Sequence, residues 1–387
     1  MATTVTPLTP QQVDDLRALV RRAFAGDGAN ERAAAPLLSS NPEALVEAVA
    51  RHRLAVCLAP TLDDTIVPAL VVEGVRASAS RQRLHALMCA AATAEAAGAL
   101  SDAGVRGLVV KGVALALQTT GEATSRGPGD IDLWVHPNDV QAAMLALEGV
   151  GYRSHLYAQT PDPASALWRY TLWADHELLL VREAMMLDLH WSLTVNRAGL
   201  PDFDTAWERR AHVQIGARLI ATLGLADALV HASAHAHKDG WRWMRSLVDI
   251  ALLSRLVQPS ERESLSRVRS VRRSALVAHD ATGVPELESL MAVNPREVAR
   301  ARRTASVQQR TGDWTSSDHW SARATYDWAH QQLELSGGPT DYARSVAGFV
   351  LAPASLVDPE TRLGISLPTA LGARARAVVS RVSPRAG

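Results

Sequence analysis

One short stretch decides the fold: residues 130–135, which read Asp-Ile-Asp-Leu-Trp-Val. Side chains two apart on a strand point to the same face, so Asp130 and Asp132 are expected on one face, with Ile131 and Leu133 on the other. Two like charges this close are unfavourable unless a cation or a proton neutralises them, and a divalent ion with oxygen ligands is the usual solution. The stretch therefore predicts a strand that carries a metal site, with Mg2+ as the expected ion and Mn2+ as its substitute.

The segment upstream predicts a place for phosphate. Residues 107–111, Gly-Leu-Val-Val-Lys, are typical of a buried strand, and residues 112–119 of a short helix. The junction at Lys111-Gly112 would offer backbone amides and a positive helix terminus to phosphate oxygens. Lys111 and Lys238 are the only lysines among 40 Lys and Arg residues. A compact charge against phosphate is one explanation, and chance in an arginine-biased sequence is the other.

Downstream, a third carboxylate is expected beside the pair. Residues 177–181 and 185–190 predict antiparallel strands around a turn at 182–184. The alternation then sends Asp188 and His190 to one face of a neighbouring strand. His190 would accept a proton or orient the acceptor group, or else only hydrogen-bond behind Asp188. A lone Asp-x-Asp is more often a solvent-facing polar row, but this surrounding set favours metal-dependent phosphoryl chemistry.

The rest of the chain predicts helices. They are expected from Thr9-Pro10 onward and over residues 42–58, 81–104, 137–149, 225–237, 241–256 and 262–279. The predicted fold class is α+β, with a small mixed β-sheet flanked by helical regions. The predicted domains are an N-terminal helical region at 1–104, an α+β core at 105–200 and a C-terminal helical region at 201–387.

A polar stripe is expected on one of these helices. Its members recur every three or four residues: His231, His235, Lys238 and Arg242, with Ser246 and Asp249 further along. The stripe could close over nucleotide phosphates through His235 and Lys238, or form a buried polar seam. A zinc site at His231 and His235 would lack an evident third ligand.

Another metal-dependent alternative is an HD-type phosphohydrolase. His279-Asp280 would supply its central dyad. The remaining ligands would need arbitrary spacings, and the Asp-x-Asp strand would stay unexplained.

Composition limits the partners and the compartment. The 387 residues are 47% hydrophobic, enough for a sizeable core, and their formal net charge is zero. Without a basic footprint, a long nucleic-acid partner is not expected. The only cysteines, Cys57 and Cys89, lie in apolar stretches and predict free thiols in a reducing compartment. A signal peptide and a run of about 18 apolar residues are both missing, so a cytoplasmic protein without a membrane partner is expected.

The ordered set of motifs resembles a known group. The strand, glycine turn, Asp-x-Asp and third acidic strand are similar to the nucleotidyltransferase superfamily of the DNA polymerase β type. More narrowly, the chain looks like the uncharacterised bacterial nucleotidyltransferase family over roughly residues 80–260. The motifs that carry this resemblance are Val110-Lys111-Gly112, Arg126, Gly129-Asp130-Ile131-Asp132-Leu133, Gly151-Tyr152, Asp188-Leu189-His190-Trp191 and His235-Ala-His-Lys238-Asp-Gly-Trp241. Two features depart from the superfamily: Val113 follows Gly112 where Gly or Ser is usual, and the gap to Asp130 is long.

The resemblance implies a function. Asp130 and Asp132 would hold the metal that binds the triphosphate, Asp188 would join a second metal, and Arg126 would contact a phosphate. The enzyme would move a nucleotide monophosphate from a nucleoside triphosphate, ATP for example, to a small-molecule or peptide acceptor with release of pyrophosphate. Natural-product tailoring or antibiotic modification would be the context. The alternative is a non-catalytic nucleotide-binding protein or a toxin-antitoxin-type regulator.

Overall fold

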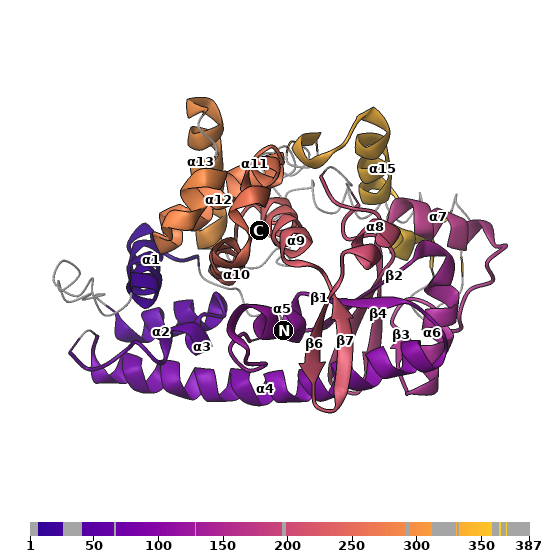
Figure 1. Ribbon diagram of the computed structural model, residues 1–387, viewed down its shortest axis with the longest axis horizontal. Coiled ribbons are helices and arrows are strands. Elements are labelled where there is room, and N and C mark those ends of the chain that lie inside the picture. The colour runs from indigo at the N-terminus through magenta and orange to yellow at the C-terminus, as the bar shows by residue number, and fades with distance from the viewer. Residues whose placement is uncertain are drawn as a thin grey trace, which may run out of the picture.

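The computed structural model has one mixed sheet with helices before and after it in the chain (Figure 1). It describes residues 7–25, 41–65, 67–127, 129–195, 199–291, 294–311 and 333–357, together with 330, 364 and 369. Seven strands lie in the order β3-β4-β5-β2-β1-β7-β6. The predicted α+β class, a mixed sheet flanked by helical regions, is confirmed.

The strands include the four that the sequence predicted around the carboxylates. They are β1 Gly107–Val110, β2 Ile131–Val135, β3 Arg153–Ser154, β4 Glu177–Arg182, β5 Met185–His190, β6 Ala211–Ile215 and β7 Arg218–Thr222. β2 is antiparallel to β1 and parallel to β5, which forms a hairpin with β4. The β6–β7 hairpin lies in a region that was expected to be helical, although Ala-His-Val-Gln-Ile alternates as a strand does. The sheet therefore extends beyond residue 200, and the division into domains remains a prediction.

Two of the predicted helices, over 42–58 and 262–279, are each divided in two, and the others differ mainly at their ends. They are α1 Pro10–Ala25, α2 Pro42–Arg51, α3 Ala55–Leu58, α4 Ala69–Asp102, α5 Gly112–Thr120, α6 Val140–Gly149, α7 Ala166–Ala174, α8 Phe203–Glu208, α9 Leu225–Lys238, α10 Met244–Leu256, α11 Pro259–Ser266, α12 Arg269–Thr282, α13 Pro295–Thr311 and α15 Pro339–Val350. Short 3-10 turns cover η2 Pro137–Asp139, η3 Pro285–Leu290 and η5 Pro353–Leu356. The helix predicted over 42–58 is broken at Arg53, where φ is 54°. Positive φ at Trp241 similarly delays the start of α10.

One long helix supports both halves of the molecule. α4 runs along one side, beneath α2 and α3 and then along the sheet (Figure 1). Cys89, Ala96 and Leu100 of α4 are buried in the same core as the sheet residues Leu133 and Leu187. By length and composition alone α4 could cross a membrane, which qualifies the expectation that no such segment exists. Its packing against the sheet makes it a structural helix of this fold.

The opposite face of the sheet packs against the later helices. Leu108 and Val110 of β1 and Trp134 of β2 share a core with residues of α9, α10 and α12. Alternation along β2 puts Asp132 on the same face as Trp134. The predicted carboxylates are therefore enclosed between the sheet and helices from the C-terminal half.

Candidate active site

Two of the predicted carboxylates are neighbours across the sheet. Asp132 on β2 and Asp188 on β5 are directly paired in the register of the two parallel strands. The third, Asp130, precedes the strand, since β2 begins at Ile131 rather than at Asp130. Asp130 nevertheless lines the same cavity as Asp132. The structure thus brings all three predicted carboxylates to one region.

Lys111 stands between the end of β1 and the start of α5. It has a φ of 54° and Gly112 one of 44°, which turns the chain sharply into the helix. A side chain at Gly112 would approach the carbonyl oxygen of Asp130 at 3.6 Å, so the start of α5 lies close to the first carboxylate. The Lys111 Nζ lies 2.8 Å from Asp132 Oδ1. The predicted phosphate lysine is thus paired with a carboxylate in this structure.

His190 links Asp132 to a further acid, Glu177. Its Nε2 lies 3.0 Å from Asp132 Oδ1, and its Nδ1 lies 3.2 Å from Glu177 Oε2. His176 Nε2 is 3.3 Å from the same Glu177 oxygen. The carboxylate of Glu177 is positioned to fix the ring orientation of His190, as acids behind catalytic or metal-binding histidines do.

The neighbours of each acid set its charge state. Burial alone would raise the pKa of Asp132, but the Lys111 ammonium and the hydrogen bond from His190 lower it well below its ordinary value. Burial raises the pKa of Asp188 to about 8, helped by the negative charges of Glu177, Asp132 and Asp130. For Glu177, burial is outweighed by His176 and His190, and its pKa falls to about 2.

This donor set suits a divalent cation. One ligand atom from each of Asp132, Asp188 and His190 lies within 4.8 Å of the others. Asp188 is a partly buried acid whose charge is opposed by three nearby acids, and a cation would relieve that repulsion. Carboxylate oxygens with one imidazole are ligands that Mg2+ and Mn2+ accept.

Arg126 lies beside the carboxylates but is held from behind. Its Nε and Nη2 each contact one oxygen of Asp249 on α10 at 2.8 Å, and both side chains are buried. A cavity of about 70 Å³ is lined by this pair together with Lys111, Asp130 and Asp132, and by His235, Arg245 and Ser246. Cationic and acidic groups therefore face each other across a narrow space.

The predicted histidine stripe is only partly continuous. α9 ends at Lys238, and the chain turns before α10 begins at Met244, so Arg242 is not on the same helix. His235 lines the cavity, and burial together with the Lys111 charge lowers its pKa well below the ordinary value. Lys238 is not among the lining residues, although its charge helps to lower the pKa of Glu177.

The other metal sites considered from the sequence gain no support. Within the described residues two groups of clustered ligands are found, and neither contains His231 or His235. His279 lies 3.6 Å from Glu288, whereas Asp280 forms a bidentate pair with Arg302. The side chains of the supposed HD dyad thus point to separate ion pairs.

Sequence reasoning missed Glu177 and Arg245. Arg182 pairs with Met185 across the predicted hairpin, and that register fixes Glu177 opposite His190. Counting back from the turn would have found this acid. Arg245 lines the same cavity as Arg126, and desolvation together with that neighbouring charge lowers its pKa to about 9. Its contact with the Gly127 carbonyl depends on tertiary packing that no local pattern reveals.

Comparison with known proteins gives one match. No curated protein and no solved structure matched this chain. The family model described as "Uncharacterised nucleotidyltransferase" matches residues 39–278, more than half of the chain. This span includes Lys111, the three carboxylates and Asp249. The chain therefore belongs to the uncharacterised nucleotidyltransferase family.

Proposed function

We propose that this protein is a metal-dependent enzyme that transfers a nucleotide monophosphate from a nucleoside triphosphate, with release of pyrophosphate. The pairing of Asp132 with Asp188 across β2 and β5, with Asp130 at the entrance to β2, carries the proposal. Membership of a nucleotidyltransferase family supports a transferase that uses a nucleoside triphosphate. Two paired acids on one sheet face, with a third just before β2 and a lysine beside them, suit phosphoryl chemistry better than any other reaction considered.

The three acids would hold Mg2+ or Mn2+. When bound, the metal supplies charge neutralisation at the phosphate oxygens. Lys111, whose Nζ lies beside Asp132, would contact a phosphate oxygen when nucleotide and metal are bound. The backbone amides at the start of α5 would contact the same phosphates.

Arg126, His235 and Lys238 would bind the nucleotide. Asp249 fixes the Arg126 guanidinium by two hydrogen bonds, so little conformational entropy would be lost when it meets a phosphate. His235 is neutral at pH 7 because its pKa is low, and it would serve as a hydrogen-bonding partner rather than as a charge. Lys238 does not line the cavity, and its charge would attract the phosphates from beside His235.

His190 would receive the proton of the acceptor or orient the acceptor group. Glu177 holds its Nδ1, which leaves Nε2 directed toward Asp132. We further propose a small-molecule or peptide acceptor in natural-product tailoring or antibiotic modification, and a cytoplasmic location. These last points rest on analogy with related enzymes.

Pyrophosphate release tests the activity. The full chain is incubated with each nucleoside triphosphate, Mg2+ or Mn2+ and a panel of small-molecule and peptide acceptors. We expect pyrophosphate release that depends on the metal. Asp188→Asn should lower its rate at least about a thousandfold, because several kcal/mol of charge stabilisation would be lost. Asp64→Asn, an exposed acid outside the site, is the matched control. Nucleotide binding without turnover across the whole panel would instead favour the non-catalytic alternative.

Metal binding gives a readout that does not depend on the acceptor. Titration of Mn2+ followed by electron paramagnetic resonance should show tight binding to the wild type and to Asp64→Asn. Loss of that binding in Asp188→Asn is expected. Equal Mn2+ affinity in all three proteins would refute the assignment of the metal site.

A further inference from the structure

A large hollow lies where β7 and β1 separate. In the described residues the two strands pair only at Val109 and Thr222, so they are no longer hydrogen-bonded toward Arg218 and Gly107. The C-terminal end of α4 borders the gap. The cavity measures about 610 Å³, whereas small-molecule sites commonly measure about 300–1,000 Å³.

This hollow is separate from the carboxylates. It lies at the beginning of β1, around Arg106, whereas Lys111 follows the end of that strand. An extended chain from Arg106 to Lys111 spans about 16 Å. A nucleotide bound at Asp132 and Asp188 would therefore not place its phosphates in the hollow.

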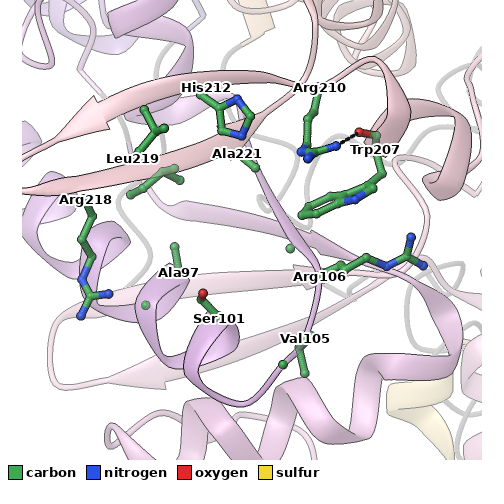
Figure 2. Close-up of a pocket in the computed structure, with 14 residues that line it drawn as sticks. Ala97, Ser101, Val105, Arg106, Trp207, Arg210, His212, Arg218, Leu219 and Ala221 are labelled. Carbon is green, nitrogen blue, oxygen red and sulfur yellow. Dashed lines mark hydrogen bonds between the residues drawn. The ribbon is translucent and has the colours of Figure 1, made fainter.

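The lining is strongly basic. Three arginines and one histidine contribute to it: Arg106, Arg210, Arg218 and His212. Figure 2 shows them around the space, and neither Asp nor Glu is among its 14 lining residues. Arg106 is paired with Asp204 at 2.8 Å through Nη2, and both of these side chains are exposed. Positive charge therefore exceeds negative charge around the hollow.

Trp207 arranges two of the guanidinium groups. Its indole lies between Arg210 and Arg106, whose Cζ atoms are 4.3 and 5.8 Å from the ring centroid (Figure 2). Arg210 also donates a hydrogen bond to the Trp207 carbonyl at 2.7 Å. Stacking and this bond restrict both side chains before any ligand binds, which lowers the entropic cost of binding.

Arg218 approaches from the other side of the gap. Its guanidinium lies over Gly98 of α4, where a Cβ would come within 2.6 Å of Cζ. The missing side chain at Gly98 is therefore what admits Arg218 to this position. The arginines reach the hollow from three different elements: the entry to β1, the segment after α8, and β7.

We infer that this hollow binds a small phosphate-bearing ligand at a second site, distinct from the proposed nucleotide site. Guanidinium groups match phosphate oxygens with paired hydrogen bonds, and three arginines around one space favour a multiply charged anion over a single carboxylate. The imidazole of His212 and the hydroxyl of Ser101 add further polar contacts at its border. The volume suits a ligand the size of a nucleotide or a phosphorylated metabolite.

Titration with inorganic pyrophosphate tests this site. Calorimetry is performed in EDTA on the full chain carrying Asp188→Asn, so that metal-dependent binding at the proposed active site does not contribute. The key variant is R210Q/R218Q. The matched control is R296Q/R303Q, which removes two charges from exposed positions on α13.

Binding at least about tenfold weaker in R210Q/R218Q is expected, since each lost charged hydrogen bond costs about 1.5–3 kcal/mol, and affinity changes tenfold per 1.4 kcal/mol. The control should bind as the parent does. Unchanged affinity in R210Q/R218Q, or an equal loss in R296Q/R303Q, would overturn the inference.

Citrate carries similar charge on carboxylates. If it bound as tightly as pyrophosphate, the assignment to phosphate would be wrong. Because Asp188→Asn is present throughout, failure here would leave the proposed transfer activity untouched.

Discussion

Asp132 and Asp188 are paired across parallel strands, yet their neighbours shift their pKa values in opposite directions. Asp132 lies between the Lys111 ammonium and His190, and its pKa is lowered. Asp188 is partly buried beside other acids, and its pKa is raised to about 8. One acid is thus stabilised as an anion within the protein, while the other would gain most from an added cation.

The contrast predicts different stabilities for two variants that change charge in the same way. Asp132→Asn should reduce the free energy of unfolding by about 3 kcal/mol, because it leaves the partly buried Lys111 charge without its partner. Asp188→Asn should leave the stability unchanged or raise it. With a pKa of about 8, Asp188 takes up a proton on folding at pH 7, and asparagine removes that cost. Urea unfolding at pH 7 without metal measures both. Similar losses in the two variants would show that Asp188 serves the packing rather than a cation.

Glu177 should act through His190. Glu177→Gln weakens the contact to Nδ1, and we expect kcat to fall by about 10–100-fold, the usual effect of losing an acid behind such a histidine. The KM for the nucleoside triphosphate should change little, because Glu177 does not line the cavity. Glu183→Gln in the exposed turn of the same hairpin is the control. A change in KM alone would contradict a role in positioning His190.

Local pattern revealed much of this site. Alternating residues gave β2 and β5, and the strand-to-helix change at Lys111 gave the turn beside them. The two-residue turn at Glu183 and Ala184 sets the register of the β4–β5 hairpin, and that register places Glu177 opposite His190. The direction of each acid's pKa was not readable, since it depends on which neighbours tertiary structure brings to each carboxylate.

Contacts between distant segments could not be predicted from local sequence patterns. Arg126 was expected near a phosphate, but its partner Asp249 lies 123 residues away and reaches it only because α10 packs against α5. The hairpin of β6 and β7 was missed for a different reason. Its strands are short, and polar or charged residues alternate with few buried ones, so the helical composition around them dominated the prediction.

The Arg126–Asp249 pair should contribute far more to the stability of the fold than an exposed ion pair of the same geometry. Its side chains are 10% and 7% exposed, whereas those of the similarly bidentate Arg302–Asp280 pair are 55% and 26% exposed. Asp249→Asn should cost about 3 kcal/mol of stability and raise the KM for the triphosphate, because it leaves a buried arginine unpaired and unaligned. Asp280→Asn should cost less than about 1 kcal/mol. Equal costs by urea unfolding would argue that burial does not set the strength of these pairs.

His52 should make the fold sensitive to mild acid. It is buried where α2 ends, and its Nδ1 accepts a hydrogen bond from the Met244 amide at 3.3 Å. Burial lowers its pKa from 6.5 to about 4, so between these values the unfolded chain binds a proton that the folded chain excludes. The free energy of unfolding must therefore fall as pH drops through this window, by about 3 kcal/mol from this residue in total.

The test compares urea unfolding at pH 7.5 and pH 4.5. His52→Asn keeps a hydrogen-bond acceptor for the Met244 amide but cannot take up a proton, so the variant should lose less stability between the two pH values than the wild type. His155→Asn, at an exposed position, should show the wild-type difference. If His52→Asn and the wild type lose the same amount, the acid sensitivity must arise from other buried histidines, such as His231 and His237, whose pKa values burial also lowers.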